Sequence, residues 1–167
     1  MKSMTKLVLA AMFAVGFISL GAPKANAATP TDTIAVTVTL DSIISVIVDV
    51  PSWAIGAKAL SATSISDLVT ATNDGNVAEK FMIKGANGAG LWTLGAVIGE
   101  DIFALGFDTT DAYETFVAID TTGVELAASV AVAGTQTFKM QYSMPSTNTK
   151  TVGLGQGFDV TVTASAP

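Results

Sequence analysis

Residues 69–85 read VTATNDGNVAEKFMIKG, two alternating runs separated by a turn. Residues 73–76, Asn-Asp-Gly-Asn, predict the turn, because Asn and Gly tolerate the positive φ angles that tight turns often need. The first run predicts a strand over about 65–72. In the second run, Val77, Phe81 and Ile83 alternate with polar residues, namely Glu79, Lys80 and Lys84. A period of two is typical of a half-buried strand, so the stretch predicts strand, turn and strand.

The same period recurs through most of the remaining chain. It predicts a pair of strands around Gly99 and three later strands, over residues 90–97, 100–107, 124–134, 135–145 and 157–167. Two stretches suggest a helix. Residues 111–118 have helical spacing for about one turn, and residues 124–134 are rich in alanine, but their apolar alternation favours a strand. Seven to nine short strands with turns between them predict an all-β fold, an antiparallel β-sandwich of Ig-like or jelly-roll type.

Two segments resemble the Ig-like domains of bacterial and archaeal surface proteins. Residues 69–85 are similar to their strand–turn–strand hairpin, which often reads V-x-N-x-G-N. Residues 130–145, VAVAGTQTFKMQYSMP, resemble their glycine turn into a strand that ends near proline. The resemblance implies a secreted Ig-like β-sandwich. Such domains serve as stalks, adhesins, filament subunits and accessory modules, so the resemblance leaves the function open.

The first 27 residues have the features of a signal peptide. Lys2 and Lys6 precede an apolar run over residues 7–20, and residues 25–27 have the A-x-A form of a cleavage site. The run is shorter than the ~20 residues of a membrane-spanning helix, and no second apolar run follows. We therefore expect cleavage after residue 27, no membrane span and a secreted or cell-surface protein; an uncleaved anchor is the alternative.

Composition narrows the range of functions. The chain has no histidine, cysteine or arginine, which removes the usual nucleophilic triads, zinc sites and bidentate phosphate recognition. Loss of the first 27 residues would leave five lysines against 14 acidic residues, a net charge of −9. Nucleic acid is therefore not an expected partner, because it binds basic surfaces. A carboxylate pair or a Ser-Lys dyad would still permit catalysis, but no pair stands out, and we expect no enzyme.

Residues 33–50, TIAVTVTLDSIISVIVDV, form an unusually long alternating run. Every even position from 34 to 50 except Ser42 is apolar. A strand of that length would span ~56 Å, about three times a typical strand. One solution is a break near Asp41-Ser42, which gives two strands that cross from one sheet to the other.

The other solution is that residues 28–41 leave their own subunit, while residues 42–167 form the β-sandwich domain. This strand would then complete the sheet of the next molecule, the donor-strand mode of β-strand addition. The contact would use four side chains on one face, Ile34, Val36, Val38 and Leu40. The pattern resembles assembled pilins and matrix fibres, which implies self-assembly into an extracellular filament, biofilm matrix or surface layer, with the chain itself as partner. One candidate receiving edge is the closing strand, residues 158–162.

Two further groups of residues suggest ligands. Trp53 and Trp92 would stack on sugar rings in a monomeric adhesin or carbohydrate-binding module, with cell-surface glycans as partners; core packing is the alternative. Five acids near predicted loops would suit Ca²⁺, a cation that takes carboxylate oxygens: Glu100, Asp101, Asp108, Asp111 and Glu114. No known calcium-loop spacing is present, and solvated loops are the alternative. No other cofactor is expected.

Overall fold

A computed structural model describes residues 35–90, 92–110, 112–151 and 155–167. The chain divides into two units after Val38, and the second, residues 39–167, contains every strand. We refer to this second unit as the body. Among the described residues there is no helix, and hence none long and apolar enough to cross a membrane.

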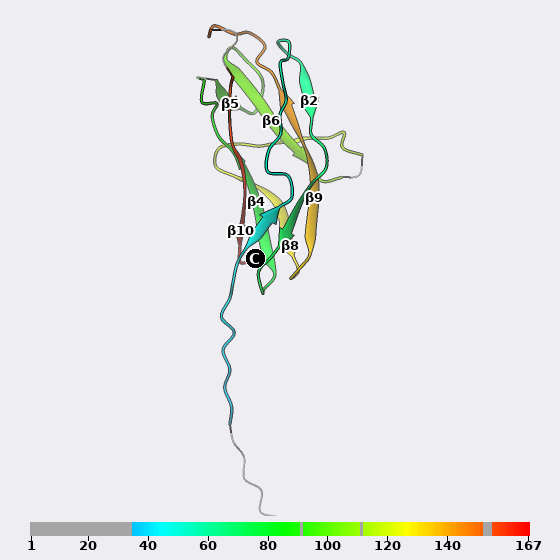
Figure 1. The fold of residues 1–167 in the computed structure, drawn as a ribbon, viewed down its shortest axis with the longest axis vertical. Helices are drawn as coiled ribbons and strands as arrows, with labels where there is room; N and C mark the ends of the chain where they lie inside the picture. Colours follow the sequence, from blue (N-terminus) through cyan, green and yellow to red (C-terminus); the bar gives the residue numbers. More distant parts are fainter. Residues whose placement is uncertain (1–34, 91, 111, 152–154) are drawn as a thin grey trace, which may run out of the picture. The chain divides into compact units, whose positions relative to one another are not determined.

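The body is all-β, as predicted, and the ten strands among its described residues form two sheets (Figure 1). The strands are β1 (Val46–Val48), β2 (Thr63–Ile65), β3 (Val69–Asn73), β4 (Glu79–Gly85), β5 (Thr93–Gly95), β6 (Ile102–Asp108), β7 (Val117–Ala118), β8 (Val124–Val130), β9 (Thr135–Ser143) and β10 (Val160–Ser165). The larger sheet has the order β1-β3-β9-β6-β5, with β2 also on β9 and β7 on β6. The smaller sheet has the order β10-β4-β8.

Alternate side chains of the two sheets form one apolar core, the arrangement of a β-sandwich. The smaller sheet contributes Phe81 and Ile83 of β4, and the larger contributes Phe103 of β6 and Phe138 of β9, all fully buried. The remaining core side chains are Val69, Ala71, Leu105, Phe107, Ile119, Leu126, Val130 and Tyr142. The period of two in the sequence therefore marks the buried face correctly in the central strands.

The turn at residues 73–76 is not the hairpin that the sequence predicts. β3 pairs with β1 and β9 in one sheet, whereas β4 pairs with β8 and β10 in the other, so the turn connects the two sheets. None of its residues has a positive φ. The side chain of Asn73 shapes the turn instead, since its Oδ1 accepts the Gly75 N–H at 2.9 Å and its Nδ2 donates to Val77 O at 2.8 Å.

Glu79 also differs from its predicted place on the polar face. Like Phe81 and Ile83, it occupies an odd-numbered position, so it lies on the same side of β4, and it is fully buried with them. Its carboxylate accepts the backbone N–H of Ser45 at 2.7 Å, and this bond offsets part of the cost of burial. Glu79 therefore belongs to the buried face of the strand, and its predicted place on the polar face is wrong.

Three other strand predictions need correction. The strand expected over 65–72 is two strands, β2 and β3, which both pair with β9. β5 and β6 form the expected pair around Gly99, but they run parallel rather than antiparallel. Residues 96–101 loop back so that β6 starts beside the start of β5 and runs in the same direction, and Asp101 takes a φ of 55° at the end of this loop. The helical turn expected at 111–118 is not seen in the described residues, where β7 lies instead.

The long first strand is the largest difference. Only Val46–Val48 is a strand, paired with Ala71–Asn73 of β3, and residues 35–45 belong to no strand. The expected strand over 34–50 is therefore wrong, and so is a break into two strands at Asp41-Ser42. β1 ends at Val48, three residues before Pro51, and proline has no backbone N–H with which to continue the hydrogen bonds of a strand. Before β1, hydrogen bonds to the turn at 73–76 replace strand pairing.

Candidate functional site

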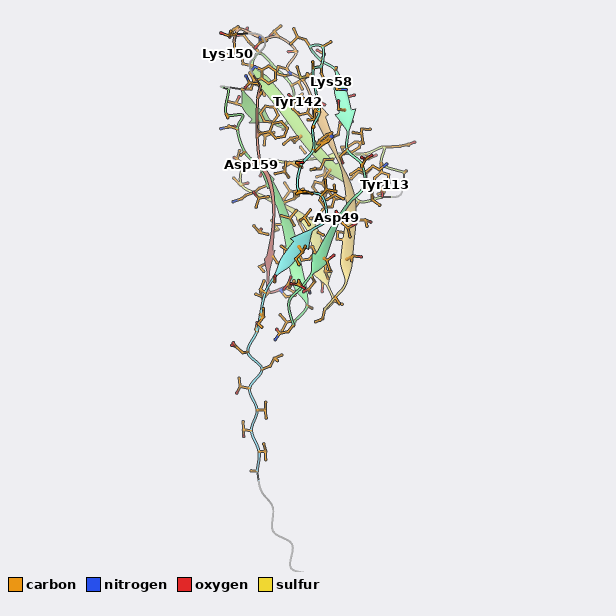
Figure 2. All side chains as sticks on the ribbon, viewed as in Figure 1. Asp49, Lys58, Tyr113, Tyr142, Lys150 and Asp159 are labelled. Carbon is orange, nitrogen blue, oxygen red and sulfur yellow. The ribbon has the colours of Figure 1, made fainter. Side chains whose placement is uncertain are left out.

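A groove of about 860 Å³ opens in the body. Residues 50–60 and residues 155–160 line it, together with the end of β9 and Trp92. Ser165 of β10 pairs with Lys80 near the 73–76 turn, whereas Val160 pairs with Gly85 at the other end of β4. The groove therefore lies in the half of the body away from that turn, where Figure 2 shows Tyr142 and Lys58, two of its lining residues.

Side chains rather than backbone bonds hold the segment 50–60 in place. Within the described chain, no backbone hydrogen bond joins residues 50–58 to another segment. Val50, Trp53 and Ile55 are partly buried against the core, and Gly56 turns the chain with a φ of 72°. A segment without ladder partners next to an apolar groove leaves room for an additional strand.

The other lining segment presents a free sheet edge. Asp159 O accepts the Ala86 N–H at 2.9 Å, and Gly157 O accepts the Ala89 N–H at 2.7 Å. Since neighbouring residues of a strand direct their N–H and C=O groups to opposite sides, Phe158 and Val160 direct theirs away from β4. β10 pairs only with β4 among the described strands. Along this edge, the backbone N–H and C=O groups of Phe158 and Val160 therefore have no backbone partner among the described residues.

The floor of the groove is aromatic. Phe158 stacks on Phe103 and on Tyr142, with ring centroids 4.9 Å and 5.4 Å apart. The Tyr142 hydroxyl donates to the Met144 sulfur at 3.3 Å. Burial raises the pKa of Tyr142 to about 12, so this phenol stays neutral at physiological pH. The floor thus favours apolar groups over charged ones.

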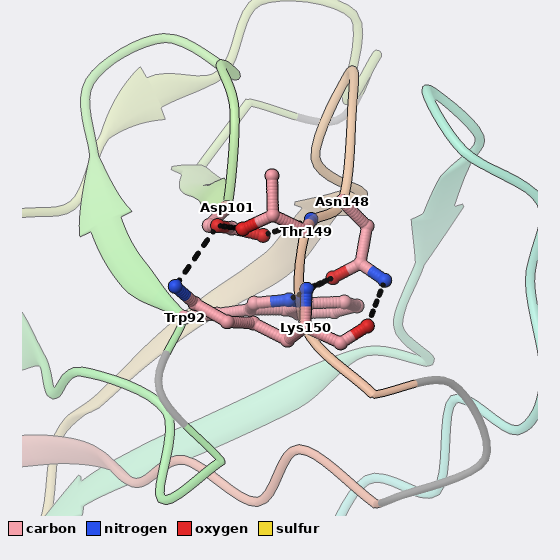
Figure 3. Close-up of polar contacts among 5 residues, drawn as sticks. All are labelled: Trp92, Asp101, Asn148, Thr149 and Lys150. Carbon is pink, nitrogen blue, oxygen red and sulfur yellow. Dashed lines mark hydrogen bonds and ion pairs between the residues drawn. The ribbon is translucent and has the colours of Figure 1, made fainter.

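A polar network supports one rim of the groove (Figure 3). The indole N–H of Trp92 donates to Asn148 Oδ1 at 2.9 Å. Thr149 donates its backbone N–H and its hydroxyl to Asp101, and Lys150 Nζ lies 3.1 Å from the same carboxylate. The hydroxyl of Thr149, more than the charge of Lys150, lowers the pKa of Asp101. These bonds join the loop after β9 to the start of β6.

A second feature lies at the other end of the body, where residues 41–45 are bound to the 73–76 turn. Asn76 donates its N–H to Ile43 O and its Nδ2 to Asp41 O, and it accepts the Ile43 N–H. Glu79 accepts from Ser45, as above. A Cβ at Gly75 would collide with Glu79 Oε1 and Ile43 O, so glycine permits this close approach. We call this set of contacts the clamp.

The structure places three of the predicted donor residues, Val36, Val38 and Leu40, outside every described strand. Val36, Val38 and Leu40 are exposed by 79%, 85% and 67%. Ile34 lies outside the described residues. Such exposure of successive apolar side chains is uncommon in a stable monomer.

The two tryptophans, far apart in the sequence, both line the groove. Each is partly buried against the core. The structure thus brings Trp53 and Trp92 to one site while it also packs them.

Sequence reasoning missed the groove and the clamp. The groove depends on where residues 50–60 and 155–160 meet in space, which no local pattern encodes. For the clamp, the sequence contains one signal. Glu79 alternates in step with the buried residues Phe81 and Ile83, and a buried carboxylate needs a partner.

The five acids proposed for Ca²⁺ are only partly described, since Asp111 lies outside the described residues. Within the described chain, no three acidic side chains group as metal ligands do. Asp101 bonds to Thr149 and Lys150, and Asp108 accepts the backbone N–H groups of Thr110 and Thr115. The bond from Thr110 is the main cause that lowers the pKa of Asp108.

No protein-family model, curated protein or solved structure matches this chain. The groove, the clamp and the exposed segment therefore carry the functional argument by themselves.

Proposed function

We propose that this chain is a secreted structural subunit that self-assembles into an extracellular filament, in which residues 28–40 of each copy complete a sheet of the next. One observation carries the proposal: Val36, Val38 and Leu40, at alternate positions of the sequence, are exposed in a segment outside every described strand. The body that follows is already a compact unit with its own core. The segment is thus free to serve a second molecule.

The energy available from donation is large. Burial of Ile34, Val36, Val38 and Leu40 would contribute ~1.5–3 kcal/mol for each side chain, before ordering costs. Backbone hydrogen bonds between donor and acceptor add to this. The contact joins different surfaces of two copies, so it is head-to-tail, and repetition without closure produces a fibre.

The clamp suits this function because it ties the donated segment to its own body. Residues 41–45 follow the donor segment directly, and their hydrogen bonds to Asn76 and Glu79 fix the point where it leaves. A mechanical force on the donor strand would therefore be transmitted to both sheets, because the 73–76 turn connects them. A filament under tension needs such a connection.

Export and the finer fold class belong to the same proposal. The basic start, apolar run and A-x-A site of residues 1–27 support secretion. The two facing sheets and the segments at 69–85 and 130–145 support an Ig-like sandwich. Its apolar core forms without cysteine, so assembly outside the cell would not require disulfides.

Negative-stain electron microscopy tests the proposal. We expect filaments from residues 28–167 and monomers from residues 41–167, because only the longer chain carries the donor segment. The shorter chain should keep its fold, since the body is a separate unit. Filaments from both chains, or from neither, would refute donation.

Point substitutions give a matched comparison within the donor segment. Val38→Asp should abolish filaments because it places a charge on the apolar face. Thr37→Asp introduces the same charge on the opposite face and should leave assembly largely intact. Light scattering of the purified chains measures both. Equal loss of assembly from the two substitutions would count against a strand with one buried face.

A second candidate function rests on the tryptophans. Trp53 and Trp92 line one groove, and paired aromatic rings suit sugar binding. A carbohydrate-binding module or adhesin would lose retention on a glycan array after Trp53→Ala. Trp92 is the less informative position, because its indole N–H already bonds to Asn148. Retention that depends on Trp53, in a chain that forms no filaments, would favour this function over the structural one.

A further inference from the structure

We propose that the groove is the acceptor site, and that it receives residues 34–40 of a second copy as a strand antiparallel to β10. This inference rests on the proposed function and adds the place and the direction of the contact.

The backbone of the groove matches a strand. Phe158 and Val160 direct their N–H and C=O groups toward the groove side of the sheet edge, away from β4. Residues 50–58 have no backbone partner in the described chain. A strand inserted here would extend the order β10-β4-β8 by one and pair the free groups.

The side chains match as well. The donor segment from Thr33 to Leu40 carries no charge, and its apolar side chains occupy even positions. The groove has an aromatic and methionine floor, and Lys58 is its one charged lining residue among those described. Insertion would cover apolar side chains on both molecules and keep the threonine face of the donor toward solvent.

The occupant comes from a second copy because of where the chain leaves the body. Leu40 precedes the clamp, at the 73–76 end of the body, whereas the groove lies in the other half. Stacking of two bodies head to tail brings the clamp end of one copy to the groove end of the next. The donor then enters with Leu40 at the entrance and Ile34 innermost.

This direction is antiparallel to β10. β10 runs from the groove half toward the turn, because Val160 pairs with Gly85 and Ser165 with Lys80. A donor from a second copy runs the opposite way. If the chain instead folded back into its own groove, Ile34 would lie farthest from the turn and the strand would be parallel to β10. Antiparallel pairing is the somewhat more stable arrangement, and it avoids a reversal at the clamped Asp41.

Two substitutions should block the groove without breaking the body. Leu60→Asp places a charge at a groove position that is already 49% exposed. Leu68→Asp is its matched control, because Leu68 is 44% exposed and lies outside the groove. Val160→Pro removes an N–H that points away from β4 and keeps an apolar ring, a change that edge strands tolerate. Thermal unfolding within about 3 °C of the parent checks that each variant folds.

Mixing the variants tests the inference. Leu60→Asp in residues 28–167 can donate but not accept, and residues 41–167 can accept but not donate. We expect each to be monomeric alone and an equimolar mixture to give heterodimers by size exclusion with light scattering. Val160→Pro should behave as Leu60→Asp does, and Leu68→Asp should polymerise as the parent does.

The other outcomes separate the two proposals. If Leu60→Asp and Val160→Pro both form polymers while residues 41–167 stay monomeric, the groove is not the acceptor site, but strand donation still holds. The same holds if the mixture gives no heterodimer. A parent chain that stays monomeric while residues 34–40 resist protease would mean insertion into its own groove, and it would overturn both proposals.

Discussion

β9 and residues 35–45 have similar sequence patterns and different structural environments. In β9, Phe138 and Tyr142 alternate with Thr137 and Gln141, and the strand pairs on one side with β3 and β2 and on the other with β6. Within residues 35–45, the stretch 36–40 alternates valine or leucine with threonine just as regularly, yet it belongs to no strand and no described strand pairs with it. Alternation therefore identifies the apolar face of a strand but does not identify the sheet that covers it.

The largest expected effect contrasts a core side chain of β9 with a donor side chain. Phe138→Ala should lower the free energy of unfolding by ~3–5 kcal/mol, because Phe138 is fully buried. Val36→Ala should change it by less than ~0.5 kcal/mol in a monomeric chain, because this side chain is exposed. Urea unfolding of Phe138→Ala in residues 41–167 and of Val36→Ala in the Leu60→Asp background measures the difference. A large loss from Val36→Ala would mean that the segment packs on its own body.

The next effect concerns the clamp. Glu79→Ala should cost ~1–3 kcal/mol, because it leaves the partly buried Ser45 N–H without its acceptor. Glu125→Ala is the matched control: Glu125 pairs with Lys80 at 2.7 Å on the surface, and its loss should cost ~0–1 kcal/mol. Denaturant unfolding of both variants measures the contrast. Comparable losses would show that the carboxylate of Glu79 does not stabilise the start of β1.

Hydrogen exchange of residues 43–46 would localise the effect of Glu79→Ala. Faster exchange confined to this segment is the expected result, since the rest of the core keeps its contacts. Uniformly faster exchange would indicate that Glu79 stabilises the whole body instead.

A smaller effect is the dependence of stability on pH. Hydrogen bonds from Gly123 and Thr122 lower the pKa of Asp120 below its ordinary 3.8, and a backbone bond from Thr110 does the same for Asp108. A pKa that is lower in the folded state means stability that is complete above the unfolded value and lost as pH falls through the folded value. The melting temperature should therefore fall between about pH 5 and about pH 2.

Asp120→Asn should flatten this decline, because an amide cannot be protonated in that range. Melting curves of the parent and of the variant, recorded over the same pH series, measure the change in slope. An unchanged slope would remove Asp120 from the groups that control acid stability.

Much of the fold could be predicted from the sequence, and the reason is local. Alternation over residues 77–85 and 135–145 predicted β4 and β9, because each strand buries one face in the core. The 73–76 turn was found, but its role as a link between sheets was not. Whether two strands around a turn pair with each other depends on their other neighbours.

The candidate site was less predictable. The exposed donor segment could be suspected because an apolar face of that length exceeds what one sandwich covers. The groove could not, because Trp53, Trp92 and Phe158 meet only after the sheets have formed. The clamp depends on Asn76 and Glu79 contacting residues more than 30 positions earlier, and no local pattern predicts such a pairing.

Hydrogen exchange of the donor segment, assembled and monomeric, tests the central claim most directly. The comparison sets filaments of residues 28–167 against the Leu60→Asp variant of the same chain. We expect the amides between Ile34 and Leu40 to be protected in the filament and to exchange at the rate of unstructured chain in the monomer. Fast exchange in both samples would contradict strand donation, and protection in both would mean that the segment belongs to its own body.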